Sequence, residues 1–183
     1  GSSDAAATLK ALNKLTSGKR SRDQLVEIGA KLGADIPFFL HGGIARVGGI
    51  GEKVFPISPS IRASQIAKHF YPLVIVKPPG GVSTAEAYRL LDELPNRESA
   101  NATARWPHCS NENDFEEVVY FHFSQVEAVA EALRDAGVKL PHLCGSGSAV
   151  FGWTHEPERV AALVEAASVG RVYLAHTTSK GEQ

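Results

Sequence analysis

The sequence predicts an α+β protein made of two parts. Stretches rich in Ala and Leu, with apolar residues three and four apart, occupy the first 32 residues. Two short strand-like segments flank a glycine-rich turn near residue 50, and strands alternate with helices after residue 70. With 183 residues, 43% of them hydrophobic, the chain is long enough to bury one sizeable core or two small ones. We expect a first domain at residues 1–57, a connector at 58–70 and a second domain at 71–183.

The first domain is expected to hold two helices, a short apolar segment and a hairpin. Their bounds are residues 4–15, 21–32, 33–40, and 44–47 paired with 53–57. Ser2, Ser3 or Asp4 can cap the first helix, because these side chains accept hydrogen bonds from unpaired N–H groups. Ser21 and Gln24 have the spacing of a capping box, which predicts the start of the second helix.

The second domain is expected to be an open sheet with helices packed on it. The strands are expected at residues 73–76, 149–153 and 171–175, and the helices at 84–93, 113–121, 124–136 and 157–167. The first of these strands is the clearest, because it is a continuous β-branched and apolar run. The polar stretch 95–110 is expected to be the most mobile segment, and Trp153 to lie in the core.

Composition excludes several functional classes. A net charge of −1 offers no basic surface for sequence-independent binding of nucleic acid. No window reaches the 18 or more apolar residues of a membrane span and no signal peptide opens the sequence, so we expect a cytoplasmic protein with no membrane partner. Cys109 and Cys144 are too few for a disulfide framework, and their spacing to histidines does not predict a metal site.

Two glycine-serine segments are candidates for phosphate binding. Gly1-Ser2-Ser3-Asp4 leads into a helix, where unpaired N–H groups and the helix dipole favour an anion. An ordinary helix cap explains this segment equally well. Gly145-Ser146-Gly147-Ser148 precedes a strand, and a flexible turn is the equally simple alternative. Cys144, just before it, is expected to be a core residue and not a nucleophile.

Three further residues are candidates with simpler alternatives. Asp35 is a carboxylate that could accept a proton, but an Asp two residues before a proline more often caps a helix or makes a turn. Thr84 and Tyr88 lie four apart at a helix start and share a face, and they are equally explained as a cap and a packing residue. Four others are expected to be structural: His41, Glu52, Asn113 and Asp114.

The order of these segments resembles the GHMP kinase superfamily. Three segments carry the resemblance: Gly1-Ser2-Ser3-Asp4-Ala5-Ala6-Ala7, Leu32-Gly33-Ala34-Asp35-Ile36-Pro37-Phe38-Phe39 and Gly145-Ser146-Gly147-Ser148-Ala149-Val150-Phe151. Within the superfamily the similarity is strongest to the branch that phosphorylates a cytidine-diphosphate-linked methylerythritol in the non-mevalonate route to isoprenoids. The resemblance covers essentially the whole sequence.

This resemblance implies a fold, a reaction and a set of roles. The fold would be the last part of an N-terminal domain like ribosomal S5 domain 2, followed by a complete ferredoxin-like C-terminal domain. ATP, with Mg²⁺, would phosphorylate a small alcohol, and Asp35 would be the general base. The phosphate-binding residues would be Gly1, Ser2, Ser3, Asp4, Gly145, Ser146 and Gly147, and the substrate-binding residues Thr84 and Tyr88. A homodimer is left open.

The resemblance also implies that the sequence begins inside the first phosphate loop. In the family, a lysine-bearing segment and the opening glycines of that loop come earlier, and Lys10 cannot be given that lysine's role. We therefore expect the chain by itself to bind ATP poorly and to expose apolar helix faces in its first domain. Two alternatives stay open: another GHMP alcohol kinase, of mevalonate or homoserine type, and a non-catalytic binding module on the same fold.

Overall fold

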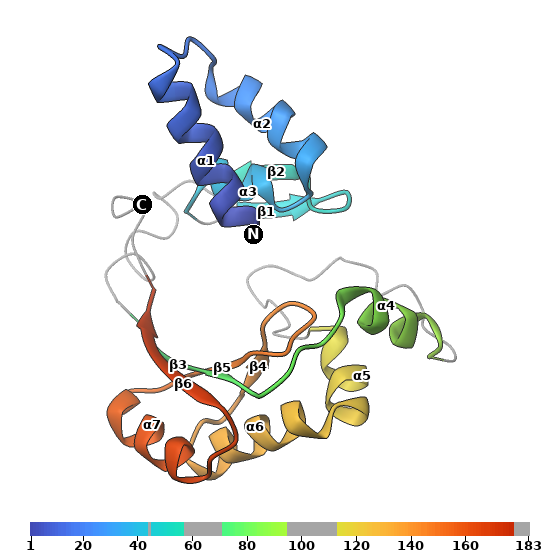
Figure 1. Cartoon of the computed structure of the whole chain (residues 1–183), viewed down its shortest axis with the longest axis vertical. Helices are drawn as coiled ribbons and strands as arrows, with labels where there is room; N and C mark the ends of the chain where they lie inside the picture. The colour runs from blue at the N-terminus through green and yellow to red at the C-terminus, as the bar shows by residue number, and fades with distance from the viewer. Residues whose placement is uncertain (44, 57–70, 95–112, 178–183) are drawn as a thin grey trace. The chain divides into compact units, whose positions relative to one another are not determined.

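The computed structural model describes residues 1–43, 45–56, 71–94 and 113–177. Their helices and strands confirm the predicted mixture of helix and sheet (Figure 1). The described residues form two compact units, unit 1 up to residue 56 and unit 2 from residue 71 to 177. The expected connector 58–70 and the expected mobile stretch 95–110 lie outside the described residues. Within the described ranges, no helix combines the length and the apolar character needed to cross a bilayer.

Unit 1 consists of three helices and a hairpin. The helices are α1 (Ser2–Leu15), α2 (Arg22–Leu32) and α3 (Ile36–His41), and strands β1 (Ala45–Gly48) and β2 (Lys53–Pro56) pair antiparallel. The predicted capping box starts α2: the Ser21 side chain accepts from Gln24 N, and the Gln24 side chain accepts from Ser21 N at 2.9 Å. Gly29 lets α2 and α3 approach closely, because a Cβ there would lie 2.8 Å from Ile36 Cγ2.

The core of unit 1 is small. Its buried apolar residues come from the three helices: Ala6, Leu25, Ile36 and Leu40. Leu12, Leu15 and Leu32 lie on the same helices with exposed fractions of 51%, 80% and 64%. Unit 1 therefore exposes apolar side chains on α1 and α2.

Unit 2 is a sheet covered by helices. In its described part, four strands form an antiparallel sheet in the order β4-β5-β3-β6, with bounds β3 (Pro72–Lys77), β4 (His142–Leu143), β5 (Val150–Trp153) and β6 (Arg171–His176). The helices are α4 (Thr84–Asp92), α5 (Phe115–His122), α6 (Ser124–Asp135) and α7 (Pro157–Ala166). The two-residue strand β4 was not predicted, because it is too short to show a period-2 pattern.

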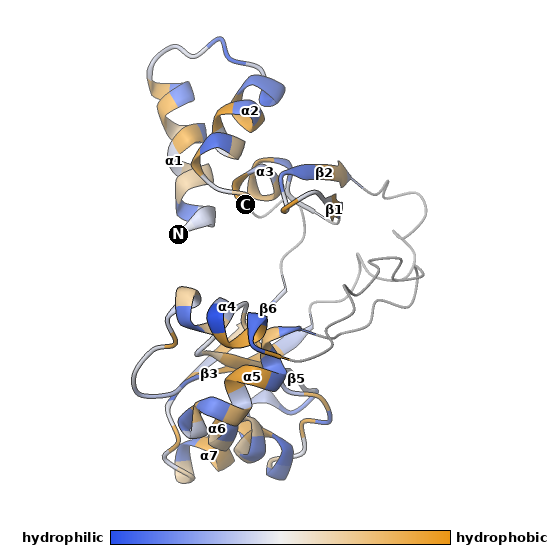
Figure 2. Cartoon of the chain, turned by 90° about the vertical axis from the view of Figure 1, so that its right-hand side faces the viewer, coloured by the Kyte–Doolittle hydropathy of each residue, from blue (hydrophilic) through white to orange (hydrophobic). Residues whose placement is uncertain are grey.

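One face of this sheet is buried under α6 and α7. Val74 and Val76 of β3 are fully buried and pack with Val150 of β5, while Leu133 of α6 and Val164 of α7 belong to the same core. The alternation of hydrophobic and hydrophilic residues along these helices can be followed in Figure 2. The period-2 pattern of β3 thus determines which of its side chains enter the core.

The opposite face of the sheet carries aromatic side chains. Trp153 pairs with Leu73 and Phe151 with Ile75, so these residues point away from Val74 and Val76. The rings of Trp153 and Phe151 lie 6.0 Å apart, and Trp153 is 43% exposed. The expectation that Trp153 lies in the core is wrong, because its position in the register places it on the face away from α6 and α7.

Candidate functional site

The first glycine-serine segment forms the opening turn of α1. Gly1 is the N-cap residue, and Ala5 N donates to Gly1 O at 2.9 Å. The N–H groups before Ala5 have no intrahelical acceptor, so they are free for an anion in the way that helix N-termini generally are. The expectation that Ser2, Ser3 or Asp4 caps the helix is wrong: the helix begins at Ser2, so all three lie inside its first turn.

Asp35 occupies the N-cap position of α3, but its side chain makes no capping hydrogen bond. The residue is exposed, and a Cβ on Gly51 would lie 3.5 Å from Asp35 Oδ1, so the carboxylate lies beside the turn of the hairpin. An Asp that served only as a cap would accept a bond from a backbone N–H two or three residues ahead. The carboxylate of Asp35 is instead available to an external donor.

The hairpin turn beside Asp35 is held by Glu52. Glu52 Oε2 accepts from Ile50 N at 2.8 Å, and bonds from the backbone N–H groups of Glu52 itself and of Ile50 lower the pKa of its carboxyl. Gly49 has φ +70, and a Cβ there would lie 2.3 Å from Glu52 Oε1. The structural role predicted for Glu52 follows from these contacts.

A pocket of about 340 Å³ in unit 1 is lined by none of the residues predicted to bind phosphate or substrate, nor by Asp35. Its lining includes Lys10, Arg20, Arg22 and His41. Lys10 Nζ donates to Phe39 O at 2.9 Å and so joins α1 to α3. Lys10 therefore has a structural contact in unit 1.

In unit 2 the second glycine-serine segment is the turn between two strands. The β4–β5 loop (residues 144–149) is closed by Cys144 N donating to Ala149 O and Gly147 N donating to Cys144 O, both at 2.9 Å. Gly145 and Gly147 have φ +58 and +97, which side-chain-bearing residues rarely adopt. Beside Gly145, no atom of the described residues lies within 4 Å of where a Cβ would be, so the described part of the chain leaves space there that a ligand could enter.

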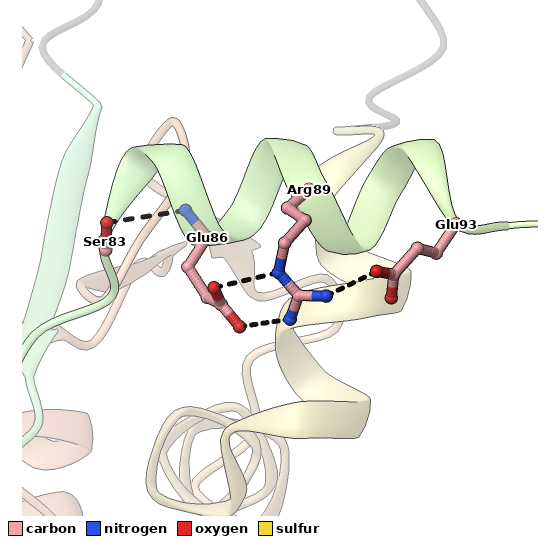
Figure 3. Close-up of polar contacts among 4 residues, drawn as sticks. All are labelled: Ser83, Glu86, Arg89 and Glu93. Atoms are coloured by element: carbon pink, nitrogen blue, oxygen red, sulfur yellow. Dashed lines mark hydrogen bonds and ion pairs between the residues drawn. The ribbon is translucent and has the colours of Figure 1, made fainter.

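Thr84 begins α4 and contacts this loop directly. Thr84 Oγ1 lies 2.9 Å from Ser146 Oγ, so a residue expected to bind substrate and one expected to bind phosphate are joined by a hydrogen bond. The start of α4 is fixed because the Ser83 side chain accepts from Glu86 N (Figure 3). The alternative that Thr84 caps α4 is wrong, because Ser83 is the N-cap residue of that helix.

Glu86, Arg89 and Glu93 form a row of ion pairs along the exposed side of α4 (Figure 3). Arg89 donates to Glu86 Oε2 from Nε at 3.1 Å and also pairs with Glu93. The hydrogen bond from Arg89 lowers the pKa of the Glu86 carboxyl, and the two carboxylates raise the pKa of Arg89. These pairs are exposed to solvent, so the row supports the helix only weakly.

Tyr88 combines packing with exposure. Its ring meets Phe115 of α5 edge to face, with centroids 4.9 Å apart, yet 54% of the residue is exposed. The packing alternative is therefore partly right, and more than half of Tyr88 remains accessible to a ligand.

Asn113 and Glu116 hold the β4–β5 loop from the side of α5. Asn113 Nδ2 donates to Leu143 O at 3.0 Å and to Gly145 O at 2.7 Å, and Asn113 Oδ1 accepts from Phe115 N. Glu116 Oε1 accepts from Leu143 N at 2.8 Å. The sequence predicts that Asn113 or Asp114 caps this helix. Asp114 is the N-cap residue but its side chain makes no capping bond, whereas Asn113, one residue earlier, accepts from Phe115 N. The contacts of Asn113 and Glu116 with the loop were not predicted. They join positions about thirty apart, which no local pattern reveals.

We expect Asn113→Ala to destabilise the protein by about 1–3 kcal/mol, because it leaves two carbonyls and one N–H without their partner. Urea denaturation measures this loss, and faster amide exchange at Cys144 and Gly147 would show that the loop has loosened. Glu131→Ala, at an exposed position of α6, is the control and should change stability by no more than about 0.5 kcal/mol. Equal losses in the two variants would contradict the role of Asn113.

Cys144 is exposed, so the expectation that it is a core residue is wrong. It lies at the start of the loop and not within a strand, which is why the core does not enclose it. Desolvation by neighbouring protein atoms nevertheless raises the pKa of its thiol. A raised pKa leaves less thiolate at neutral pH, which disfavours a nucleophilic role.

Among the described residues, no three His, Cys, Asp or Glu side chains gather closely enough to hold a metal ion.

The residues predicted to bind phosphate or substrate, or to act as the base, fall into two sets. Gly1, Ser2, Ser3, Asp4 and Asp35 belong to unit 1, while Thr84, Tyr88, Gly145, Ser146 and Gly147 belong to unit 2. Within unit 2 the structure brings Thr84 and Ser146 into contact.

Comparison with family models finds two matches. Residues 1–43 match the GHMP kinases N terminal domain, and residues 90–170 match the GHMP kinases C terminal domain. Together these matches include more than half of the chain and touch both units.

Comparison with individual proteins also finds kinases that match most of this chain. A 4-diphosphocytidyl-2-C-methyl-D-erythritol kinase of Geobacillus sp. (strain WCH70) is 37% identical over 169 residues, which cover 87% of this chain and 56% of that protein. The protein of the same name from Desulfitobacterium hafniense (strain Y51) is 32% identical over 99% of this chain and 64% of its own length. The crystal structure of a 4-(cytidine 5'-diphospho)-2C-methyl-D-erythritol kinase superposes with a TM-score of 0.69 at 30% identity, over 96% of this chain and 63% of that one. The chain spans somewhat more than half the length of these relatives.

Proposed function

Since the chain belongs to the GHMP kinase family, we propose that the complete protein transfers the γ-phosphoryl group of ATP to the 2-hydroxyl of 4-diphosphocytidyl-2-C-methyl-D-erythritol. The observation that carries this proposal is that relatives bearing this enzyme's name match the chain across both units. The reaction would belong to the non-mevalonate route to isoprenoids. A cytoplasmic location stays a prediction from the sequence, and a homodimer stays open.

Asp35 is proposed as the general base. In the transfer, the substrate's hydroxyl oxygen forms a bond to the γ-phosphorus while the bond from that phosphorus to the β–γ bridging oxygen breaks, and the hydroxyl proton passes to a carboxylate. The absence of a capping bond on Asp35 supports this role, because its oxygens are free to accept that proton. ADP leaves with the electron pair of the broken bond.

Phosphate binding is proposed for two segments. Gly1, Ser2, Ser3 and Asp4 would offer the unpaired N–H groups of the first turn of α1. In the β4–β5 loop, Gly145 and Ser146 would offer their N–H groups, and Gly147, whose own N–H donates to Cys144 O, would let a phosphate approach the loop closely. Mg²⁺ would enter with ATP, held largely by the phosphates, since Mg²⁺ in such sites takes one or two carboxylates and several waters. It would offset the negative charge that develops during transfer.

Substrate binding is proposed for Thr84 and Tyr88. The exposed part of the Tyr88 ring can stack on a pyrimidine, while Phe115 supports the ring from α5. The Thr84 hydroxyl, already bonded to Ser146, can also bond to a substrate oxygen or amine.

The test is a phosphorylation assay of the complete gene product with ATP and three alcohols: the cytidylyl methylerythritol, mevalonate and homoserine. We expect ADP release with the first and none above background with the others. Turnover of mevalonate or homoserine alone would overturn the substrate assignment. No turnover of any alcohol by folded protein would instead favour a non-catalytic module.

A further inference from the structure

Lys77, which no prediction singled out, lies where three segments of unit 2 meet. It is the last residue of β3, and Val76 beside it pairs with Val150 at the start of β5. The antiparallel register therefore brings Lys77 level with the end of the β4–β5 loop, just before β5 begins. The β3–α4 turn (residues 78–83) starts at the same point.

The ammonium group of Lys77 bonds to both of these segments. Lys77 Nζ donates to Gly80 O at 2.9 Å in the β3–α4 turn and to Ser148 Oγ in the β4–β5 loop. Ser148 Oγ in turn lies 3.3 Å from Gly80 O, to which it donates. Ser148 is only 2% exposed, so the bonds of its hydroxyl to Lys77 and Gly80 are partly buried, whereas the bond from Lys77 to Gly80 O is exposed.

The partners of Lys77 are neutral oxygens. No ion pair among the described residues includes Lys77. Hydrogen bonds from a charged donor are roughly twice as strong as those between neutral groups, and they strengthen further where water is excluded. The contacts of Lys77 are thus suited to fixing the distance between the turn and the loop.

Both segments that Lys77 joins lead to residues of the candidate site. The β3–α4 turn leads into Thr84, the first residue of α4, and the β4–β5 loop contains Ser146, whose hydroxyl lies 2.9 Å from that of Thr84. The two segments also pack together, because a Cβ on Gly147 would lie 3.4 Å from Val82 Cγ2. Asn113, just before α5, also holds the loop through Leu143 O and Gly145 O.

We propose that Lys77 is a positioning residue that fastens the β4–β5 loop to the β3–α4 turn and thereby keeps Ser146 against Thr84. This inference rests on the proposed function: through this contact, the phosphate-binding loop and the start of the substrate-binding helix act as one unit. Lys77 acts through the loop and the turn and does not itself touch the substrates. Binding of ATP and of the cytidylyl substrate is therefore coupled, and loosening the contact weakens both.

The test compares variants of the complete enzyme. Lys77→Met keeps the length of the side chain and removes the donors, and it should raise KM for both ATP and the cytidylyl substrate by roughly 10- to 100-fold. Lys77→Arg, which can still donate to both oxygens, should recover most of this loss. Lys139→Met, at an exposed lysine of unit 2, is the matched control and should leave both KM values within about twofold.

A double-mutant cycle separates positioning from a general loss of stability. If Lys77 acts through Ser146, the effects of Lys77→Met and Ser146→Ala on KM are not additive. Additive effects, or KM values unchanged while only the melting temperature falls, would overturn the proposal. If Lys77→Met does not fold, Ser148→Ala removes one acceptor and serves in its place, with the same outcomes.

Hydrogen exchange does not depend on activity, so it tests the positioning role of Lys77 separately from the proposed kinase function. Hydrogen exchange should speed up at the Cys144 and Gly147 amides in Lys77→Met but not in Lys139→Met, since both amides close the loop. If the wild-type enzyme phosphorylates none of the alcohols, the proposed function fails, while this exchange measurement still tests whether Lys77 holds the loop. Unchanged exchange in Lys77→Met would contradict the positioning role in either case.

Discussion

Replacing Asp35 by Asn in the complete enzyme is expected to lower kcat by roughly 10²- to 10⁴-fold, the usual contribution of a general base. The amide has the shape of the carboxylate but cannot take up the substrate's proton. Because Asp35 is exposed and makes no capping bond, the change should cost at most about 0.5 kcal/mol of stability. Rates of ADP release give kcat, and isothermal titration gives the dissociation constant for ATP, which should change little.

The control for this experiment is Asp135→Asn, an exposed carboxylate at the end of α6. It changes the net charge by the same amount, and we expect its kcat to match that of the unaltered enzyme. Near-normal turnover in Asp35→Asn would leave Asp35 as an N-cap residue without a chemical role. A large loss in ATP affinity would also contradict the assignment, because a base acting on the alcohol does not hold the nucleotide.

Leu133→Ala is expected to destabilise the protein by about 2–5 kcal/mol, the range for emptying a fully buried leucine site. Leu133 of α6 is 0% exposed and lies in the core under the sheet with Val74, Val76 and Val164. Removing three of its carbon atoms forfeits their transfer free energy and leaves a cavity that the packed core can only partly close. Urea denaturation followed by circular dichroism measures the loss.

Leu163→Ala provides the same chemical change on α7, where the leucine is 44% exposed. It should cost less than about 1 kcal/mol, because the side chain buries less surface and Ala is the better helix former. Similar losses in the two variants would mean that Leu133 is not enclosed as the structure has it.

Local sequence patterns predicted helices and strands well where residues close together in the sequence determine them. The capping box at Ser21 and Gln24 and the β-branched run of β3 depend on neighbours within a few residues, so both were readable from the sequence. The pairing of β1 with β2 was readable for the same reason, since a glycine-rich turn joins them.

Predictions failed where position in the fold decides burial. Cys144 and Trp153 are both apolar residue types, yet one begins an exposed loop and the other lies on the sheet face away from α6 and α7. The caps proposed for α1 failed because the helix starts two residues earlier than expected, and helix ends are the least certain part of such predictions.

By itself, the sequence determined the mixture of helix and sheet, the family and the residue types available for phosphoryl transfer. These follow from apolar periodicity and from the order of a few short segments. Only the tertiary structure decided which of those residues touch: Thr84 meets Ser146 across 62 positions and Lys77 meets Ser148 across 71. Such contacts depend on the strand order β4-β5-β3-β6 and on its register, which bring the end of β3 beside the start of β5. Strand order is a property of the packed sheet as a whole, so no single segment of sequence encodes it.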